Sequence, residues 1–151
     1  MQLSGETMPL RRMEILKSDF DRIKMESLEA QKTRREANGF FFGERIDKTA
    51  KVEDVLHLPY KPPASKTTEL QLRQLLLGHK PIVNKFLSET GYEESDYNGY
   101  YHSHPNGVLR YSEGDLKLNR SLGDRVHFLY APPIGYACIN CLGEHVEVVV
   151  I

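Results

Sequence analysis

The sequence predicts an α/β fold, and three observations lead to this class. Segments patterned as strands and segments patterned as helices are mixed along the chain, without a strict repeating strand–helix unit. The chain has 151 residues, enough to bury roughly two thirds of its unfolded surface in one core. It contains no internal repeat and no low-complexity tract. We therefore expect one domain over residues 1–151.

The first half of the chain alternates extended and helical patterns. Met13–Leu16 is a short extended piece, and Ser18 is a good N-cap for a helix to about Arg35, in which apolar residues recur at helical spacing. Three consecutive phenylalanines within Gly39–Ile46 indicate a strand that is buried on both faces. Val52–Leu58 is predicted to be a further strand.

A loop follows over Pro59–Thr68, which contains several prolines and polar residues. Glu69–Thr90 has a helical pattern that Gly78 and Pro81 break or restart in the middle. A strand, a helix, a second strand and a hairpin are expected after it: Tyr100–His104, Glu113–Leu122, Arg125–Ala131, and Ile134–Asn140 with His145–Ile151.

Composition and charge exclude several classes of partner. Twenty basic and 21 acidic residues nearly cancel, so nothing predicts a polyanion partner, and the basic run at Lys32–Arg35 is typical of a solvated helix end. Met1–Arg12 lacks the apolar core of a leader segment, and no later run approaches membrane-spanning length. We expect a soluble, cytoplasmic protein that binds neither nucleic acid nor membrane.

Two cysteines, Cys138 and Cys141, are too few for a disulfide framework. A second metal site with the nearby His145 is disfavoured, because a single Cys-x-x-Cys lacks the partner ligands of structural zinc. Buried or half-buried thiols in the predicted hairpin are the expected outcome.

The residues that carry chemistry are concentrated in His-Ser-His-Pro at 102–105 and, six residues later, Ser-Glu-Gly-Asp at 112–115. Alternate residues of a strand share a face, so His102 and His104 project two imidazoles toward one point. Asp115 can complete the set if a helix begins near Ser112. Two nitrogens and one carboxylate oxygen, with a fourth position left for water, are how catalytic zinc is held.

Each half of this pattern also has a purely structural explanation. A His-x-His pair can hydrogen bond at a sheet edge, and Ser112 three residues before Asp115 resembles a helix capping box. Capping and metal ligation do not exclude each other, because Asp115 on the first helical turn can still face the metal. Both pairs at close range, with Pro105 ending the hydrogen-bonding capacity of the strand, favour a metal site.

These residues resemble the signature of the JAB/JAMM (MPN+) zinc metalloproteases, and all spacings agree. The signature also includes an upstream Glu in Glu-x-x-Gly-x-x-x-Gly, which residues 36–43 fit. Alone, Glu36 would be taken as a solvated carboxylate at a helix end, and only the resemblance favours it over Glu44 or Glu26. The resemblance covers essentially the whole chain. It implies the JAB/MPN domain, a curved mixed sheet packed with helices in a cytidine-deaminase-like architecture.

The resemblance also implies the role of each site residue. One zinc ion per chain is bound by His102, His104 and Asp115. Glu36 takes a proton from water and returns it to the leaving amine. Ser112 donates a hydrogen bond to the oxyanion, although its spacing alone fits a helix cap equally well.

The implied function is hydrolysis of an isopeptide or peptide bond that follows the C-terminal tail of a ubiquitin-like protein. Prokaryotic stand-alone members of the family are associated with ubiquitin-like and sulfur-carrier proteins, including bacterial conjugation systems linked to phage defence, so E1-like or E2-like operon partners are expected. We expect Leu58–Thr68 and Asn106–Tyr111 to form the walls of a narrow channel for a glycine-ended tail, although Val108 and Leu109 could instead pack inward.

Other functions stay open at this stage. One is a general zinc endopeptidase of the cell-wall or phage-tail type, and another is a noncatalytic JAB-fold scaffold that binds partners. A nucleobase deaminase is disfavoured, because deaminases take ligands from Pro-Cys-x-x-Cys and the Cys-x-x-Cys here follows Ala137.

Overall fold

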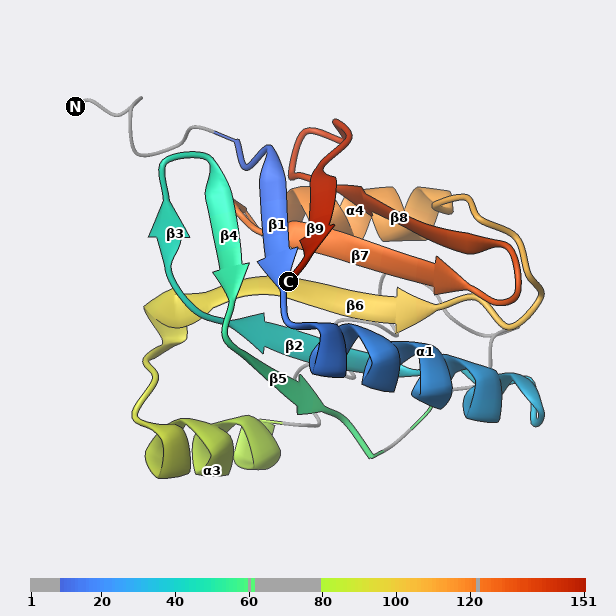
Figure 1. Ribbon diagram of the computed structural model, residues 1–151, viewed down its shortest axis with the longest axis horizontal. Helices are drawn as coiled ribbons and strands as arrows, with labels where there is room; N and C mark the ends of the chain where they lie inside the picture. Colours follow the sequence, from blue (N-terminus) through green and yellow to red (C-terminus); the bar gives the residue numbers. More distant parts are fainter. Residues whose placement is uncertain (1–8, 60, 62–79, 122) are drawn as a thin grey trace.

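The computed structural model describes residues 9–59, 61, 80–121 and 123–151 (Figure 1). In chain order, the described helices and strands are β1 (Arg12–Ile15), α1 (Lys17–Gln31), β2 (Asn38–Phe42), β3 (Arg45–Ile46), β4 (Thr49–Val52), β5 (Asp54–His57), α3 (Lys80–Thr90), a 3₁₀ turn (Glu94–Asp96), β6 (Tyr97–Ser103), α4 (Glu113–Ser121), β7 (Val126–Ala131), β8 (Gly135–Ile139) and β9 (Glu147–Val150).

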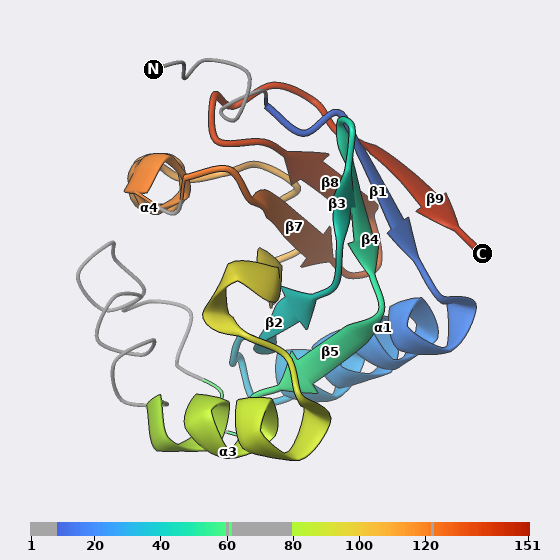
Figure 2. The ribbon, with the colours of Figure 1, turned by 90° about the vertical axis from the view of Figure 1, so that its left-hand side faces the viewer.

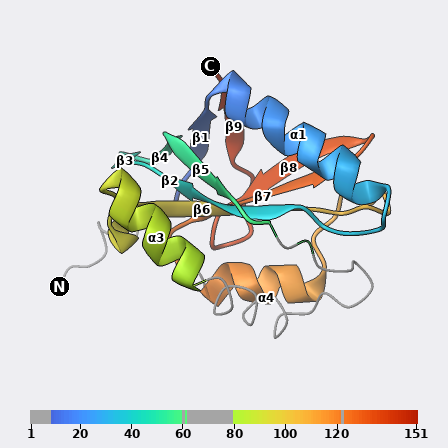
Figure 3. The same cartoon turned by 90° about the horizontal axis from the view of Figure 1, so that it is seen from below.

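The predicted α/β class is confirmed, with the strands divided between two mixed sheets. The five-stranded sheet has the order β5-β2-β6-β7-β8, and the four-stranded sheet has the order β3-β4-β1-β9. Helix α1 covers one face of the five-stranded sheet, and α3 and α4 lie on the opposite face (Figure 3). The four-stranded sheet lies on the α1 side, away from α4 (Figure 2).

Each face of the five-stranded sheet has its own hydrophobic core. The prediction that β2 is buried on both faces is confirmed, because Phe40, Phe41 and Phe42 are 4%, 0% and 2% exposed. Phe41 contributes to the larger core, under α1 and the four-stranded sheet. Phe40 and Phe42 contribute to the smaller core, which α3 and Leu118 of α4 complete. Alternate residues of the central strands therefore face different environments.

The predicted boundaries of α1 are wrong at both ends. The N-cap is Leu16, not Ser18, because the chain passes directly from β1 into the helix. Leucine has no side-chain acceptor and makes no cap bond, and the Lys17 N–H donates to the Ile151 carbonyl oxygen. The helix ends at Gln31 and does not reach Arg35. Arg34 adopts a left-handed backbone (φ 57°), which turns the chain so that the Arg35 N–H donates back to Ala30.

Two predicted strands are each divided. The segment Gly39–Ile46 breaks at Gly43, where the chain passes so close to β4 that a Cβ would collide with the Lys51 carbonyl oxygen. The segment Val52–Leu58 breaks at Glu53, where the chain crosses from β4 in one sheet to β5 in the other. Gly43-Glu44-Arg45 interrupts the apolar run at the first break. Val52, Leu56 and Leu58 keep their alternation across the second break, so periodicity alone did not reveal that one.

The predicted C-terminal hairpin exists only near its turn. There the Asn140 N–H donates to Glu144, and the Val146 N–H donates to the Cys138 carbonyl oxygen. Beyond these bonds the strands separate, because β8 pairs with β7 while β9 pairs in parallel with β1. Cys138 is buried and Cys141 is half-buried, both as free thiols, which agrees with the expectation from the sequence.

Within the described residues, α4 and β7 agree with their predicted bounds to within one residue, whereas β6 begins at Tyr97, three residues before its predicted start. The expected loop over Pro59–Thr68 and the first part of Glu69–Thr90 lie mostly outside the described residues. The described remainder of that segment is α3, with Pro81 in the first turn, where a missing N–H breaks no helical hydrogen bond. None of the helices in the described ranges is both long and apolar enough to cross a membrane.

Candidate metal centre

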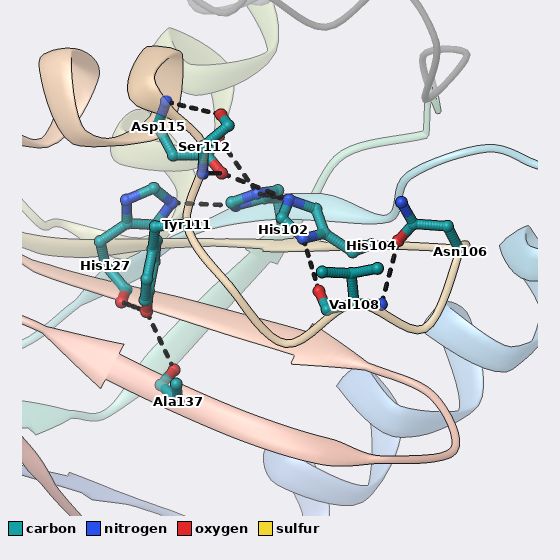
Figure 4. A network of polar contacts seen from close by, with 9 residues as sticks. All are labelled: His102, His104, Asn106, Val108, Tyr111, Ser112, Asp115, His127 and Ala137. Atoms are coloured by element: carbon teal, nitrogen blue, oxygen red, sulfur yellow. Dashed lines mark hydrogen bonds and ion pairs between the residues drawn. The ribbon is translucent and has the colours of Figure 1, made fainter.

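Strand β6 positions both predicted histidines on one face. It lies in the middle of the five-stranded sheet, between β2 and β7, and its pairing continues past Ser103 because the His104 N–H donates to Tyr130 at 2.9 Å. His102 is fully buried, and His104 is partly exposed. The two Nε2 atoms lie 3.1 Å apart. The alternation that predicted two convergent imidazoles is therefore present in the structure (Figure 4).

Helix α4 brings the carboxylate to the same point through its capping box. The Ser112 N–H donates to Asp115 Oδ2 at 2.9 Å, and the Asp115 N–H donates to Ser112 Oγ at 3.1 Å. The structural explanation of this motif is therefore correct, since Ser112 caps α4. The cap also fixes the Asp115 side chain, which is buried and faces both imidazoles. Asp115 Oδ1 lies 3.4 Å from His102 Nε2, and Oδ2 lies 3.3 Å from His104 Nε2.

The three side chains have the spacing that a tetrahedral ion requires. For zinc, with bonds of about 2.0–2.1 Å, neighbouring ligand atoms lie about 3.3 Å apart. The ligand atoms of His102, His104 and Asp115 all lie within 4.8 Å of one another, and the contacts between them span 3.1–3.4 Å. No other such group that could hold a metal is found in the described part of the chain. The donor set of two imidazoles and one carboxylate fits a divalent ion such as zinc.

The loop after β6 fixes the His104 ring. His104 Nδ1 lies 2.9 Å from the Val108 carbonyl oxygen, which can only accept, so this nitrogen carries the proton and Nε2 keeps its lone pair. An Asx turn shapes the loop, in which the Val108 N–H donates to Asn106 Oδ1. Gln31 of α1 holds the start of the loop by donating to the Pro105 carbonyl oxygen at 3.0 Å.

His102 has an outer partner that the sequence did not predict. Its Nδ1 lies 2.9 Å from Nε2 of His127, a fully buried residue of β7. The only sign of this contact in the sequence is that His127 is a single histidine within the otherwise apolar strand β7. Pairing of β6 with β7 could not be derived from the sequence, so this contact could not be derived either.

The electrostatics of the cluster keep Asp115 negatively charged and favour positive charge beside it. Burial would raise the pKa of Asp115, but the facing His102 and His104 and the Ser112 N–H together hold it well below its usual range. Burial would lower the pKa of His102, yet Asp115, and more weakly Glu36, raise it. A cation between these groups is therefore electrostatically favoured.

Glu36 is buried at 3% exposure, which rules out a solvated carboxylate at a helix end. The chain on either side of it is held by Ser103 of β6. The Ala37 N–H donates to Ser103 Oγ at 2.8 Å, and the Ser103 N–H donates to the Ala37 carbonyl oxygen at 3.0 Å. The residue between the two histidines thus anchors the segment that carries Glu36.

A pocket of about 250 Å³ opens over the cluster. Its walls come from the segment before β2, the loop after β6 and the start of α4: Glu36, His104, Pro105, Asn106, Val108, Arg110, Tyr111, Ser112 and Asp115. Val108 is 42% exposed, so it does not pack inward. All five residues that the sequence singled out meet at or directly behind this pocket, with His102 behind it. The other expected wall, Leu58–Thr68, lies mostly outside the described residues.

Comparisons with known proteins place this geometry in context. The family model for prokaryotic homologues of the JAB domain matches residues 22–146. The solution structure of protein DSY2949 from Desulfitobacterium hafniense is similar, with a TM-score of 0.62 and 20% identity over 92% of both chains. No curated protein matches the chain in sequence.

Two further solved structures are similar over 94% of this chain and 98% of theirs. The JAB1/MPN domain protein AF2198 from Archaeoglobus fulgidus has a TM-score of 0.51 and 18% identity. A structure of JAMM, described as a metalloprotease-like zinc site in the proteasome and signalosome, has a TM-score of 0.50 and 20% identity. At these identities, the likeness establishes the fold alone.

Proposed function

This chain belongs to the prokaryotic homologues of the JAB domain, and from that premise we propose that it is a zinc-dependent metallopeptidase. The observation that carries the proposal is the convergence of His102, His104 and Asp115 at 3.1–3.4 Å beneath a pocket that Glu36 and Ser112 also line. Zinc bound by these three ligands would supply a Lewis acid that makes water nucleophilic at neutral pH.

Glu36 is the proposed proton carrier. Its carboxylate is buried and lines the pocket, and it is not one of the three proposed ligands. It would accept a proton as water attacks the carbonyl carbon and then deliver that proton to the amide nitrogen as the carbon–nitrogen bond breaks. The carboxylate returns to its starting state after each turnover.

Ser112 is the proposed donor to the oxyanion. Its Oγ accepts the Asp115 N–H through a lone pair, so its hydroxyl hydrogen is not consumed by the helix cap. Ser112 is exposed and lines the pocket, where this hydrogen can reach the carbonyl oxygen that becomes negative during attack. Capping and catalysis are therefore compatible in one side chain.

We propose that the substrate is the C-terminal tail of a ubiquitin-like protein, cleaved at the isopeptide or peptide bond that follows it. Two features support a slender tail. The pocket of about 250 Å³ is smaller than the roughly 300–1,000 Å³ of typical sites for drug-sized ligands. Its wall includes the side chains of Val108 and Tyr111, against which a narrow tail with small residues such as glycine would pack. With this substrate class we also propose a role in bacterial ubiquitin-like conjugation, including antiphage defence.

The test uses purified protein with zinc and fusions of a ubiquitin-like protein, followed by mass spectrometry. One series carries a Gly-Gly junction, and a matched series carries bulky residues there. We expect cleavage after Gly-Gly only, and none by Glu36→Gln. Equal cleavage of both series would identify a general endopeptidase. Zinc binding without cleavage of any peptide or fusion would identify a noncatalytic scaffold.

A further inference from the structure

We infer that His127 is a positioning residue, which orients His102 and fixes its tautomer for metal binding. This inference rests on the proposed metal site and extends it to a neighbouring strand. His127 lies on β7, where it is paired with Tyr100 of β6, two residues before His102. Its Nε2 lies 2.9 Å from His102 Nδ1, and the two ring centroids are 4.8 Å apart (Figure 4).

The positions of the protons define what His127 does. To ligate a metal through Nε2, His102 must carry its proton on Nδ1, and that N–H then needs an acceptor. The acceptor in place is His127 Nε2, which offers a lone pair only if the His127 proton sits on Nδ1. The opposite arrangement, with His127 donating, would put the proton of neutral His102 on Nε2 and block ligation.

His127 is held firmly in this orientation. Tyr100 and Tyr111 flank its ring, with centroids at 5.3 Å and 5.0 Å. The Tyr111 hydroxyl donates to the His127 carbonyl oxygen at 2.6 Å and also lies 3.1 Å from the Ala137 carbonyl oxygen on β8. These contacts fix both the backbone and the ring, so the Nε2 lone pair stays directed at His102.

A purely structural role explains His127 poorly. Its Nδ1 is buried without a hydrogen-bond partner among the described residues, and a buried unsatisfied polar group is destabilising. An apolar side chain of similar size would fill the same space without that cost. The contact that compensates for the cost is the one to His102.

The two histidine ligands therefore have different outer partners. His104 donates to a backbone carbonyl, whereas His102 donates to a neutral imidazole. Neither partner adds a full negative charge behind the ligand, unlike the carboxylates that often occupy this position. Asp115 is then the one charged ligand of the proposed ion, which favours strong Lewis acidity.

The test compares His127→Gln with His127→Asn and His127→Leu. Gln places an acceptor oxygen near the position of Nε2, whereas Asn is too short and Leu is apolar. Zinc affinity is measured by chelator competition, and the histidine tautomers are followed by ¹⁵N NMR of the zinc-loaded protein. We expect about 10- to 100-fold weaker zinc binding for Asn and Leu, as is typical when an outer-shell partner is lost, and near wild-type affinity for Gln.

Phe128→Leu is the control for lost stability, because Phe128 is the next residue of β7 but faces the other core. It should lower the melting temperature without changing zinc affinity. Equal zinc affinity for wild type, His127→Asn and His127→Leu would overturn the inference, as would equal weakening in His127→Gln and His127→Asn. A wild-type protein that binds no zinc would overturn the proposed function as well. If His127→Leu does not fold, the Gln and Asn variants decide.

Discussion

Two histidine–carboxylate clusters lie on opposite faces of the five-stranded sheet, and neighbouring residues of β6 contribute to each. On the α4 side, His102, His104 and Asp115 form the open cluster, beneath the pocket. On the α1 side, Tyr101 joins Glu26 of α1 and His57 of β5 in the closed cluster. The residue types are similar, so the difference between the clusters has another cause.

In the closed cluster, hydrogens point inward and every contact has a donor and an acceptor. The Tyr101 hydroxyl donates to Glu26 Oε1 at 2.6 Å, and His57 Nδ1 lies 2.8 Å from the same oxygen. Burial would raise the pKa of Glu26, but the hydrogen bonds from His57 and Tyr101 lower it overall. The carboxylate is satisfied by protein groups alone, so this cluster has no need of a metal.

In the open cluster, the hydrogens of the proposed metal-binding tautomers point outward, toward Val108 and His127. The inward-facing Nε2 atoms of His102 and His104 are then lone pairs, which meet a negatively charged Asp115. Three acceptors with no hydrogen between them require a cation. The outer partner of an imidazole therefore decides whether its inward nitrogen serves as a hydrogen-bond donor or as a metal ligand.

Removing a proposed ligand should have the largest effect and separate the two clusters most sharply. His104→Ala should reduce zinc from about one ion per chain to near zero and abolish hydrolysis, because two remaining ligands hold zinc weakly. His57→Ala, in the closed cluster, should keep the zinc. The zinc content per chain is measured by elemental analysis of both purified variants. Stoichiometric zinc in His104→Ala would contradict the ligand assignment.

Glu36→Gln should keep zinc and lose hydrolysis by about 10²- to 10⁴-fold, the usual contribution of a general base. The amide preserves the shape of the side chain and removes only its basicity. Single-turnover rates and zinc content are measured together. Glu44→Gln is the matched control, because Glu44 is exposed and should leave the rate unchanged. If Glu44→Gln hydrolyses the substrate slowly and Glu36→Gln hydrolyses it at the wild-type rate, Glu44 is the general base instead.

Ser112→Gly should lower kcat by about 10²- to 10³-fold, because an oxyanion donor acts in the transition state. Glycine costs only a few tenths of a kcal/mol at an N-cap, so it removes the hydroxyl with little loss of helix stability. Ser112→Ala should show the same kinetic loss with about 1 kcal/mol of destabilisation. Kinetics and urea unfolding of both variants separate the roles. Near-normal kcat in Ser112→Gly would leave Ser112 as a cap alone.

The features that were predicted correctly from the sequence are those set by local geometry. A spacing of two residues along one strand fixes the convergence of His102 and His104, and a spacing of three residues at the start of one helix fixes the Ser112–Asp115 box. His127 was missed because its contact depends on which strand pairs with β6. The separation of β8 from β9 was missed for the same reason, since a short loop between two strands favours a hairpin until a third strand competes.

The closed cluster could not be predicted from the sequence for a related reason. Glu26, His57 and Tyr101 come from a helix and two strands that are not paired with each other, and no spacing in the sequence connects them. Glu26, an alternative to Glu36 for the upstream glutamate of the signature, lies on the opposite face of the sheet. The family resemblance, and not spacing, selected the glutamate that lines the pocket.

The smallest predicted effect concerns the stability of the closed cluster and its dependence on pH. Glu26→Gln should destabilise the protein by about 1.5–3 kcal/mol at neutral pH, the usual value of a hydrogen bond to a charged group. Because folding lowers the pKa of Glu26, its stabilising contribution is complete above the unfolded value of about 4.5 and is lost as the pH falls through the lower folded value.

The difference in unfolding free energy between wild type and Glu26→Gln should therefore be constant from pH 7 down to about 5 and shrink below about 4.5. Urea unfolding of both proteins with a chelator present keeps the open cluster free of metal, and acid effects on Asp115 cancel because both proteins share them. Hydrolysis by the zinc-loaded variant should stay near normal at low temperature. A difference that grows toward acid pH would mean that the pKa of Glu26 is raised in the folded state, and the closed cluster would then resemble a protonated, charge-neutral hydrogen-bond network.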